Sequence, residues 1–337
     1  MRQEKGLGPD RRICVAPMMD CTDRHDRYLL RLISRRVLLY TEMITANALV
    51  HGDPARLLAY DAFEHPVALQ VGGSEPGRMA AAARMAEDFG HDEVNINVGC
   101  PSDRVQNGAF GACLMAEPET VAACVRAMRE CVDIPVTVKT RIGIDDMDSY
   151  EHLDRFTAAV VQAGTETLIV HARKAWLQGL SPKENREIPP LDYERVHRLK
   201  RDWPDLEVIL NGGIRTLDEA ADCLPGVDGC MLGRGPYGSP WALATADSRF
   251  WGDVDPASSP REVVAAYLPY VRARLAEGVP VRQMTRHMGG LFSGCPGARA
   301  WRRTLAEGAA AGGGVEVIER ALACLPVEAA GPVAAAG

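Results

Sequence analysis

The chain has 337 residues, 47% of them hydrophobic and 25% charged, a composition that excludes wholesale disorder and allows one large domain plus a smaller one. Its 38 basic and 45 acidic residues give a net charge of −7, which argues against a polyanionic partner unless the cations gather on one local face. The polar stretch 1–12 lacks the apolar core of a signal peptide and no later run would span a membrane, so we expect a cytoplasmic protein.

Eight short apolar segments predict β-strands. Several are nearly continuous runs of β-branched and other apolar residues, as is typical of strands buried on both faces of a parallel sheet. In chain order the segments are 13–17, 38–41, 67–71, 93–97, 136–140, 167–171, 207–211 and 229–233.

Helical patterns lie between these segments. Ser74, followed by Glu75 and Pro76, predicts one helix start, and Thr216 with Glu219 fits a capping box at another. In the stretch that begins at Pro118, apolar residues recur at helical spacing, which predicts that Cys124 is a core residue.

Strands that alternate with helices in this way predict an α/β fold, a (β/α)₈ TIM barrel over residues 11–250. The alternative is a doubly wound open sheet, but the first strand lacks the glycine-rich turn of that fold. After a Pro/Ser/Asp linker, helical patterns without strands predict a small all-α helical domain over 261–325. The Ala/Gly/Pro-rich stretch 326–337 predicts a disordered tail.

Glycines follow the seventh and eighth predicted strands, in Asn211-Gly212-Gly213 and in Gly233-Arg234. Barrel enzymes often bind a phosphate group at this place, because glycine lets backbone N–H groups approach it closely. The alternative is that the glycines only form tight turns.

Gln70, Lys139 and His171 end the third, fifth and sixth predicted strands and should face the same end of the barrel. A glutamine amide can bind the edge of a heterocycle, and a lysine can stabilise negative charge on it, so the set suits a flavin. A single histidine of this kind is more commonly a hydrogen-bonded core residue, but the position of His171 at a strand end, before Arg173 and Lys174, favours contact with a ligand.

Cys100 follows the fourth predicted strand, between Gly99 and Pro101. A neutral thiol at the barrel mouth can act as a general acid, although a free cysteine is often just a small buried side chain. The ten cysteines include no Cys-x-x-Cys pair, so neither disulfides nor a metal site are predicted.

Several motifs together closely resemble the tRNA-dihydrouridine synthases, and in particular their A-type group. They are Ala16-Pro17-Met18-Met19-Asp20, Tyr40-Thr41-Glu42-Met43, Asn95 to Ser102, Lys139-Thr140-Arg141-Ile142-Gly143, Arg173 to Leu177 and Gly179 to Arg186. One departure is Cys21, where relatives commonly carry tryptophan.

The resemblance implies a flavoenzyme that uses FMN and NADPH to reduce the C5–C6 double bond of uridine in the D-loop of tRNA, at positions 20 and 20a. Hydride would reach C6 from reduced FMN, and Cys100 would protonate C5. It also implies a monomer. The FMN contacts it implies are Pro17, Met18, Met19, Gln70, Lys139, His171, Asn211, Gly212, Gly213, Gly233 and Arg234. The substrate and tRNA contacts it implies are Asn97, Arg141, Lys183 and Arg186.

Arg299, Arg302 and Arg303 lie at helical spacing in the predicted helical domain, which places them on one face. In an acidic protein this face favours phosphate contact, and the alternative is an ordinary solvated surface. Two other functions stay open: an FMN barrel that acts on a free small molecule, and a tRNA-binding factor without catalytic activity.

Overall fold

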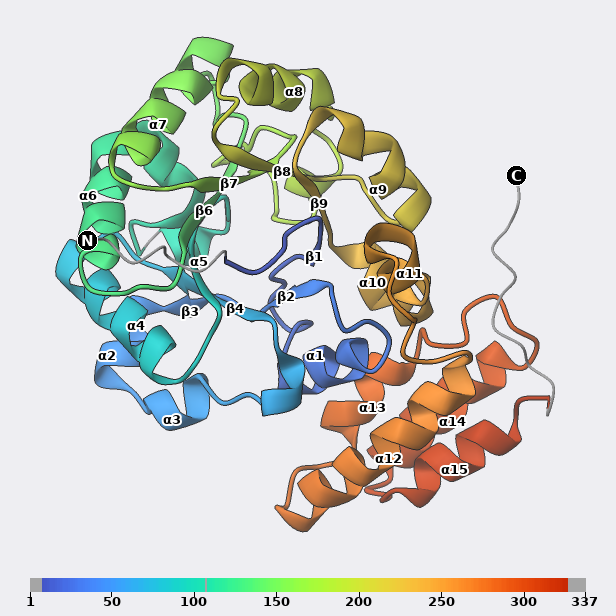
Figure 1. Ribbon diagram of the computed structural model, residues 1–337. Coiled ribbons are helices and arrows are strands. Elements are labelled where there is room, and N and C mark those ends of the chain that lie inside the picture. The colour runs from blue at the N-terminus through green and yellow to red at the C-terminus, as the bar shows by residue number, and fades with distance from the viewer. Residues whose placement is uncertain (1–7, 107, 327–337) are drawn as a thin grey trace.

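The computed structural model describes residues 8–106 and 108–326 and has the predicted barrel. Eight parallel strands form a closed ring, because β1 pairs with both β2 and β9 while β2 also pairs with β4 (Figure 1). The ring strands are β1 (Ile13–Val15), β2 (Leu38–Tyr40), β4 (Val67–Gly72), β5 (Glu93–Val98), β6 (Val136–Arg141), β7 (Thr167–His171), β8 (Glu207–Asn211) and β9 (Gly229–Leu232).

Each ring strand begins at the residue that the sequence predicts. The ninth strand, β3 (Ile44–Thr45), was not predicted, since two residues are too short to show a pattern. It pairs with the end of β4, where Ile44 lies opposite Val71.

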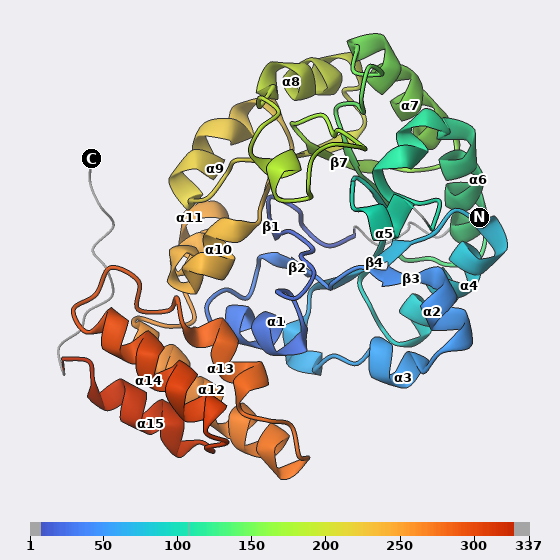
Figure 2. The same cartoon turned by 180° about the vertical axis from the view of Figure 1, so that it is seen from behind.

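Helices surround the ring on the outside (Figures 1 and 2). The predicted helix starts are confirmed: α4 begins at Pro76, and Thr216 and Glu219 form both hydrogen bonds of a capping box. The helices up to the linker are α1 (Arg24–Arg31), α2 (Ala46–His51), α3 (Pro54–Leu57), α4 (Pro76–Asp88), α5 (Asp103–Gln106), α6 (Pro118–Arg129), α7 (Tyr150–Gln162), α8 (Tyr193–Asp202), α9 (Leu217–Cys223), α10 (Arg234–Gly238) and α11 (Ala246–Trp251).

The interior of the barrel has an apolar part and a polar part. The apolar part is one buried cluster of Cys14, Ala16, Leu38, Tyr40, Ala68, Ile169, Ile209 and Met231. Amide, hydroxyl and carboxylate side chains of β4, β5 and β6 are buried as well, and their hydrogen bonds satisfy them without water. Cys124 is 1% exposed in α6, as its spacing predicted.

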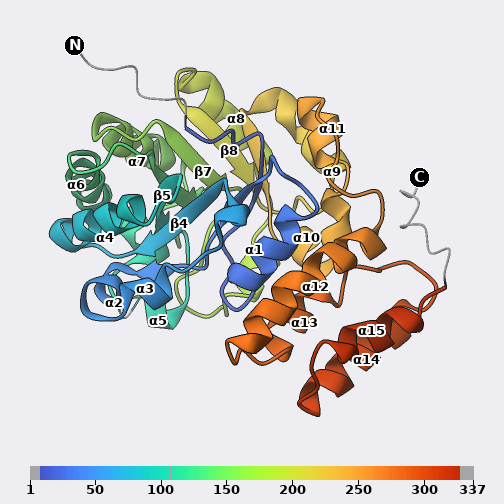
Figure 3. The ribbon, with the colours of Figure 1, turned by 60° about the horizontal axis from the view of Figure 1, so that its bottom comes forward.

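Four helices follow the linker and pack beside the barrel (Figure 3). They are α12 (Pro260–Ala276), α13 (Arg282–Met288), α14 (Ala298–Ala310) and α15 (Glu316–Ala323). Trp301 is fully buried among them, where its indole N–H donates to the Met288 carbonyl at 3.0 Å. The predicted tail lies outside the described residues apart from Pro326.

Asp23 joins the helical segment to the barrel. Its carboxylate caps α1 by accepting the backbone N–H groups of His25 and Asp26, and it also contacts Arg286 at 2.5 Å and His287 at 3.0 Å on α13. Arg286 therefore belongs to an ion pair between the two parts of the chain. Within the described residues, no helix is long and apolar enough to cross a membrane.

Two buried histidines make the fold sensitive to acid. Burial lowers the pKa of His25 to about 4 and that of His91 to about 3, so both imidazoles are neutral in the folded protein at neutral pH. In the unfolded chain they take up protons below about pH 6.5. Because the unfolded state then binds more protons, the free energy of unfolding should fall as the pH falls from about 6.5 to about 4.

Urea unfolding at about pH 7.5 and about pH 5 checks this expectation. His91→Gln should reduce the difference between the two denaturation midpoints, whereas His51→Gln, at an exposed position, should leave it unchanged. An equal difference in wild type and His91→Gln would show that His91 does not contribute.

Candidate active site

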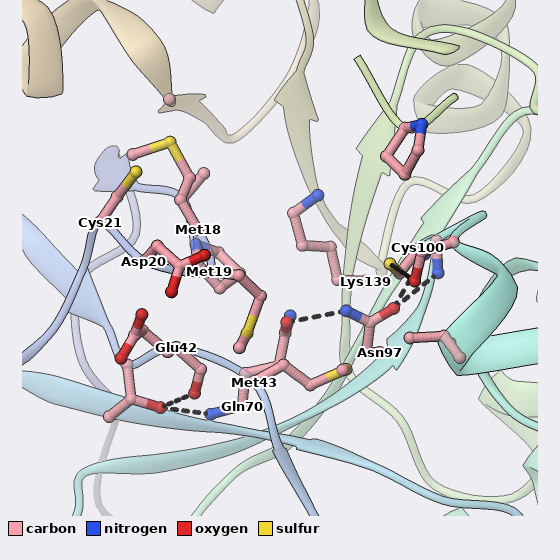
Figure 4. Close-up of a pocket in the computed structure, with 18 of the residues that line it drawn as sticks. Met18, Met19, Asp20, Cys21, Glu42, Met43, Gln70, Asn97, Cys100 and Lys139 are labelled. Carbon is pink, nitrogen blue, oxygen red and sulfur yellow. Dashed lines mark hydrogen bonds between the residues drawn. The ribbon is translucent and has the colours of Figure 1, made fainter. Parts of the chain in front are cut away.

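A cavity of about 1340 Å³ opens at the carboxyl ends of the strands. The size exceeds the range of roughly 300–1,000 Å³ of most small-molecule sites, so it can hold a large cofactor together with part of a substrate. Figure 4 shows Gln70, Asn97, Cys100 and Lys139 around it. Residues from at least seven different strands or the loops after them line the cavity, as the barrel fold predicts.

The loop after β5 holds Cys100 at the cavity. The Asn97 side-chain oxygen accepts the backbone N–H groups of Gly99 and Cys100, both at 3.0 Å, and the Cys100 carbonyl accepts the N–H of Ala112 at 2.9 Å. The thiol is partly exposed and lies 3.4 Å from the Ser102 hydroxyl. Cys100 thus lines the cavity at the edge of the main apolar cluster, against which it also packs.

Lys139 extends into the same cavity from β6. Its amine donates to the side-chain oxygen of Asn211 at 3.0 Å. Burial and the neighbouring Arg141 guanidinium lower the pKa of Lys139 to about 7, while Cys100 acts in the opposite direction. A cation in this position is stabilised when a negatively charged group enters the cavity.

His171 and Gly212 fit together at the ends of β7 and β8. Burial, followed by the charges of Arg141 and Lys139, lowers the pKa of His171 well below its usual value, so its imidazole is neutral. Gly212 has φ +109°, and a Cβ there would lie 2.3 Å from a ring carbon of His171. Only glycine therefore lets the chain pass this histidine.

The predicted phosphate site lies beside these residues. Gly213, with φ +79°, and Gly233 both line the cavity, and a Cβ at Gly233 would make only ordinary contacts, 3.6 Å from the Met18 sulfur and 3.8 Å from the Ala16 Cβ. Arg234 follows and forms an ion pair with Glu187 at 2.6 Å. Pro17, Met18 and Met19 line the cavity from the loop after β1, and the Met19 side chain is 54% exposed.

Arg141 lies at the cavity but is almost fully buried. Its guanidinium donates to the carbonyl oxygens of Gly99 at 2.8 Å and of Lys174 and Asn185 at 3.1 Å. These bonds tie the Cys100 loop to the loop after β7. A direct contact between Arg141 and substrate stays a prediction.

The loop after β7 carries Arg186 into the cavity and Lys183 beside it at an exposed position. Asn185 is fully buried between them and bonds to the backbone of Trp176 and Leu180. Sequence reasoning missed Asn185 as an organising residue. The sequence signal available was an asparagine within a run of charged residues, which is too weak to find it.

Arg299, Arg302 and Arg303 are all exposed on α14, on the side opposite Ala298, Trp301 and Leu305. They do not line the cavity. In Figure 2, which looks at the end of the barrel that carries α5, α14 lies nearer to the viewer than α12.

Within residues 8–106 and 108–326, no group of His, Cys, Asp and Glu has the arrangement of a metal site.

Two solved structures share the fold. An old yellow enzyme homologue from Zymomonas mobilis superimposes with a TM-score of 0.51 at 12% identity, over 71% of this chain and 89% of that one. A 2-naphthoyl-CoA reductase complex gives the same TM-score and identity over 69% of this chain and 49% of that one.

Sequence comparisons extend over nearly the whole chain. A protein named tRNA-dihydrouridine(20/20a) synthase from Escherichia coli K12 is 58% identical, over 92% of this chain and 90% of its own. One of the same name from Vibrio vulnificus is 56% identical, over 94% of this chain and 98% of its own. The model of the dihydrouridine synthase family, Dus, matches residues 14–325. The chain therefore belongs to the dihydrouridine synthase family.

Proposed function

We propose that this protein reduces a uridine in the D-loop of tRNA to 5,6-dihydrouridine, at positions 20 and 20a, with FMN as cofactor and NADPH as reductant. Relatives at 56–58% identity carry the corresponding name. The observation that supports the chemistry most is the thiol of Cys100 at the wall of a cavity that also contains the Lys139 amine.

The residues at the cavity fit FMN. Gly212, Gly213, Gly233 and Arg234 would hold its phosphate, because glycine leaves the backbone open and Arg234 adds positive charge. Gln70 and Lys139 would bind the polar edge of the flavin ring, with His171 and Asn211 beside them, and Pro17, Met18 and Met19 would pack on its apolar surface. When bound, the flavin supplies the hydride that reduces C6 of the uracil.

Cys100 supplies the proton. As C6 is reduced, negative charge develops on the uracil toward O4, and the thiol donates its proton to C5. Asn97 positions this thiol, since its side-chain oxygen binds the backbone N–H of Cys100 at 3.0 Å. The neutral imidazole of His171 adds no charge that would compete with the Lys139 cation.

The target base must leave the stack of the tRNA to reach the thiol, because both faces of a stacked base are covered. Lys183 and Arg186 lie on the loop at the cavity mouth, where they would contact the sugar–phosphate backbone of the tRNA near the turned-out uridine. The domain over 261–325, with Arg299, Arg302 and Arg303, would bind the body of the tRNA as part of a monomeric enzyme.

An assay with purified protein, FMN, NADPH and an unmodified tRNA transcript tests this function. We expect dihydrouridine at positions 20 and 20a and no reduction of free uridine under the same conditions. Transcripts with cytidine at one of the two positions separate the sites, and NADH in place of NADPH tests the reductant. Equal rates on free uridine and tRNA would instead support a barrel that acts on a small molecule.

A further inference from the structure

A chain of hydrogen bonds runs through the polar part of the barrel, from the start of β5 to its end. It links Glu93, Thr137, Asn95, Gln70 and Asn97 in that order, from three neighbouring strands. The pairing register places Gln70, Asn95 and Thr137 side by side on β4, β5 and β6. The hydrogen bonds therefore run over three adjacent strands at one level and then continue along β5 to the cavity.

The chain begins at a carboxylate. Glu93 forms an ion pair with Arg11 at 2.7 Å and accepts the hydroxyls of Tyr40 at 2.7 Å and Thr137 at 2.5 Å. An ionised carboxylate can only accept hydrogen bonds. The single proton of the Thr137 hydroxyl is thus committed to Glu93, and its oxygen is left as an acceptor.

Three amides follow in one orientation. The Asn95 amide nitrogen donates to the Thr137 hydroxyl oxygen, and the Gln70 nitrogen donates to the Asn95 oxygen, both at 2.8 Å. The Asn97 nitrogen donates to the Gln70 oxygen, also at 2.8 Å (Figure 4). Each amide thus presents its nitrogen toward Glu93 and its oxygen toward the cavity end of the chain.

The far end requires the same orientation independently. The Asn97 oxygen accepts the backbone N–H groups of Gly99 and Cys100, and a backbone N–H can only donate. Reversing one amide anywhere in the chain would bring two donors or two acceptors together. Since Glu93, Asn95, Thr137 and Gln70 are at most 1% exposed, water could not relieve that conflict.

We propose that Glu93, Thr137 and Asn95 are positioning residues that set the orientation of the Gln70 and Asn97 amides and so hold the Cys100 backbone in place. This inference rests on the proposed function, in which the Cys100 thiol is the proton donor. It also assigns a polarity to the site: the Asn97 oxygen is occupied by two N–H groups, so toward the cavity Asn97 offers an N–H donor.

Thr137→Val tests the proposal, because valine keeps the shape of threonine and removes its hydroxyl. Amide hydrogen exchange at Gly99 and Cys100 should become about tenfold faster in the protein without substrate. The kcat for dihydrouridine formation should fall about 10- to 100-fold, with KM for tRNA within about twofold of wild type. Thr137→Ser, which restores the hydroxyl, should return both values to near wild type.

Thr167→Val is the matched control. Thr167 is also buried on a barrel strand, and its hydroxyl donates at 2.7 Å to Glu207, the second carboxylate that pairs with Arg11. The Thr167 hydroxyl lies outside the chain of amides. Its removal should therefore leave kcat and the hydrogen exchange of Gly99 and Cys100 unchanged. Thermal unfolding verifies that each variant folds, and Thr137→Ala replaces Thr137→Val if the latter does not.

Equal effects of Thr137→Val and Thr167→Val on exchange and kcat would overturn the proposal, as would failure of Thr137→Ser to restore them. The exchange measurement needs no substrate. If hydrogen exchange in Thr137→Val responds as expected while the wild-type protein forms no dihydrouridine, the proposed function is wrong. The structural role of the hydrogen-bond chain then still stands.

Discussion

Replacing Cys100 with alanine is expected to lower the rate of dihydrouridine formation by about 10²- to 10⁴-fold, the usual contribution of a positioned general acid. Alanine removes the thiol but leaves the backbone N–H that Asn97 holds and the carbonyl that accepts from Ala112. Binding of FMN and tRNA should therefore stay close to wild type.

The measurement is dihydrouridine formed in a single turnover, with the flavin already reduced and tRNA in excess. Cys113→Ala is the control, because Cys113 is a partly buried thiol nearby that bonds to the Phe110 carbonyl and does not line the cavity. Cys113→Ala should retain wild-type turnover. Wild-type turnover in Cys100→Ala would refute the proton-donor role.

The barrel could be predicted from sequence because each of its strands is buried on both faces. Such strands are rich in apolar and β-branched residues, even where polar side chains interrupt them as Asn95 and Asn97 do in β5, and these segments mark where every ring strand begins. The convergence of Gln70, Lys139 and His171 on one cavity follows from the same fact, since parallel strands end at the same edge.

Hydrogen-bond partners on different strands could not be predicted in this way. The roles of Thr137 and Asn95 depend on register, which brings together residues that are 42 positions apart and leaves no local pattern. Arg286 and Asp23 are a second example, because these ion-pair partners lie 263 positions apart and no local pattern connects them.

Neutralising the exposed face of α14 is the second change with a large expected effect. Arg299, Arg302 and Arg303 are exposed together, and the buried Trp301 between them anchors the helix in the main apolar cluster. Within the described residues, none of the three arginines forms a salt bridge, so their charge is available to phosphate groups of RNA. Glutamine at all three positions should leave the fold intact, because the buried face of α14 is untouched.

The triple Arg→Gln variant should weaken tRNA binding by on the order of 10²-fold near 0.1 M salt and reduce the slope of log affinity against log salt by about two to three units. The cause is the release of fewer counterions when fewer phosphates are neutralised. Affinity and slope are measured by titrating labelled tRNA between about 0.05 and 0.2 M salt. The binding of free uridine and of flavin should be the same in this variant as in wild type, since the three arginines lie outside the cavity.

A double variant of α8, Arg198→Gln with Arg201→Gln, controls for general charge, because these exposed arginines form ion pairs with Asp202 and Glu194 on the outside of the barrel. It should leave the salt slope unchanged. If the α14 and α8 variants shift the slope equally, long-range charge explains the binding and α14 is an ordinary solvated surface. A shift confined to the α14 variant places phosphate contacts on that helix, because a contacted phosphate releases its own counterions whereas distant charges are screened within a Debye length of about 10 Å.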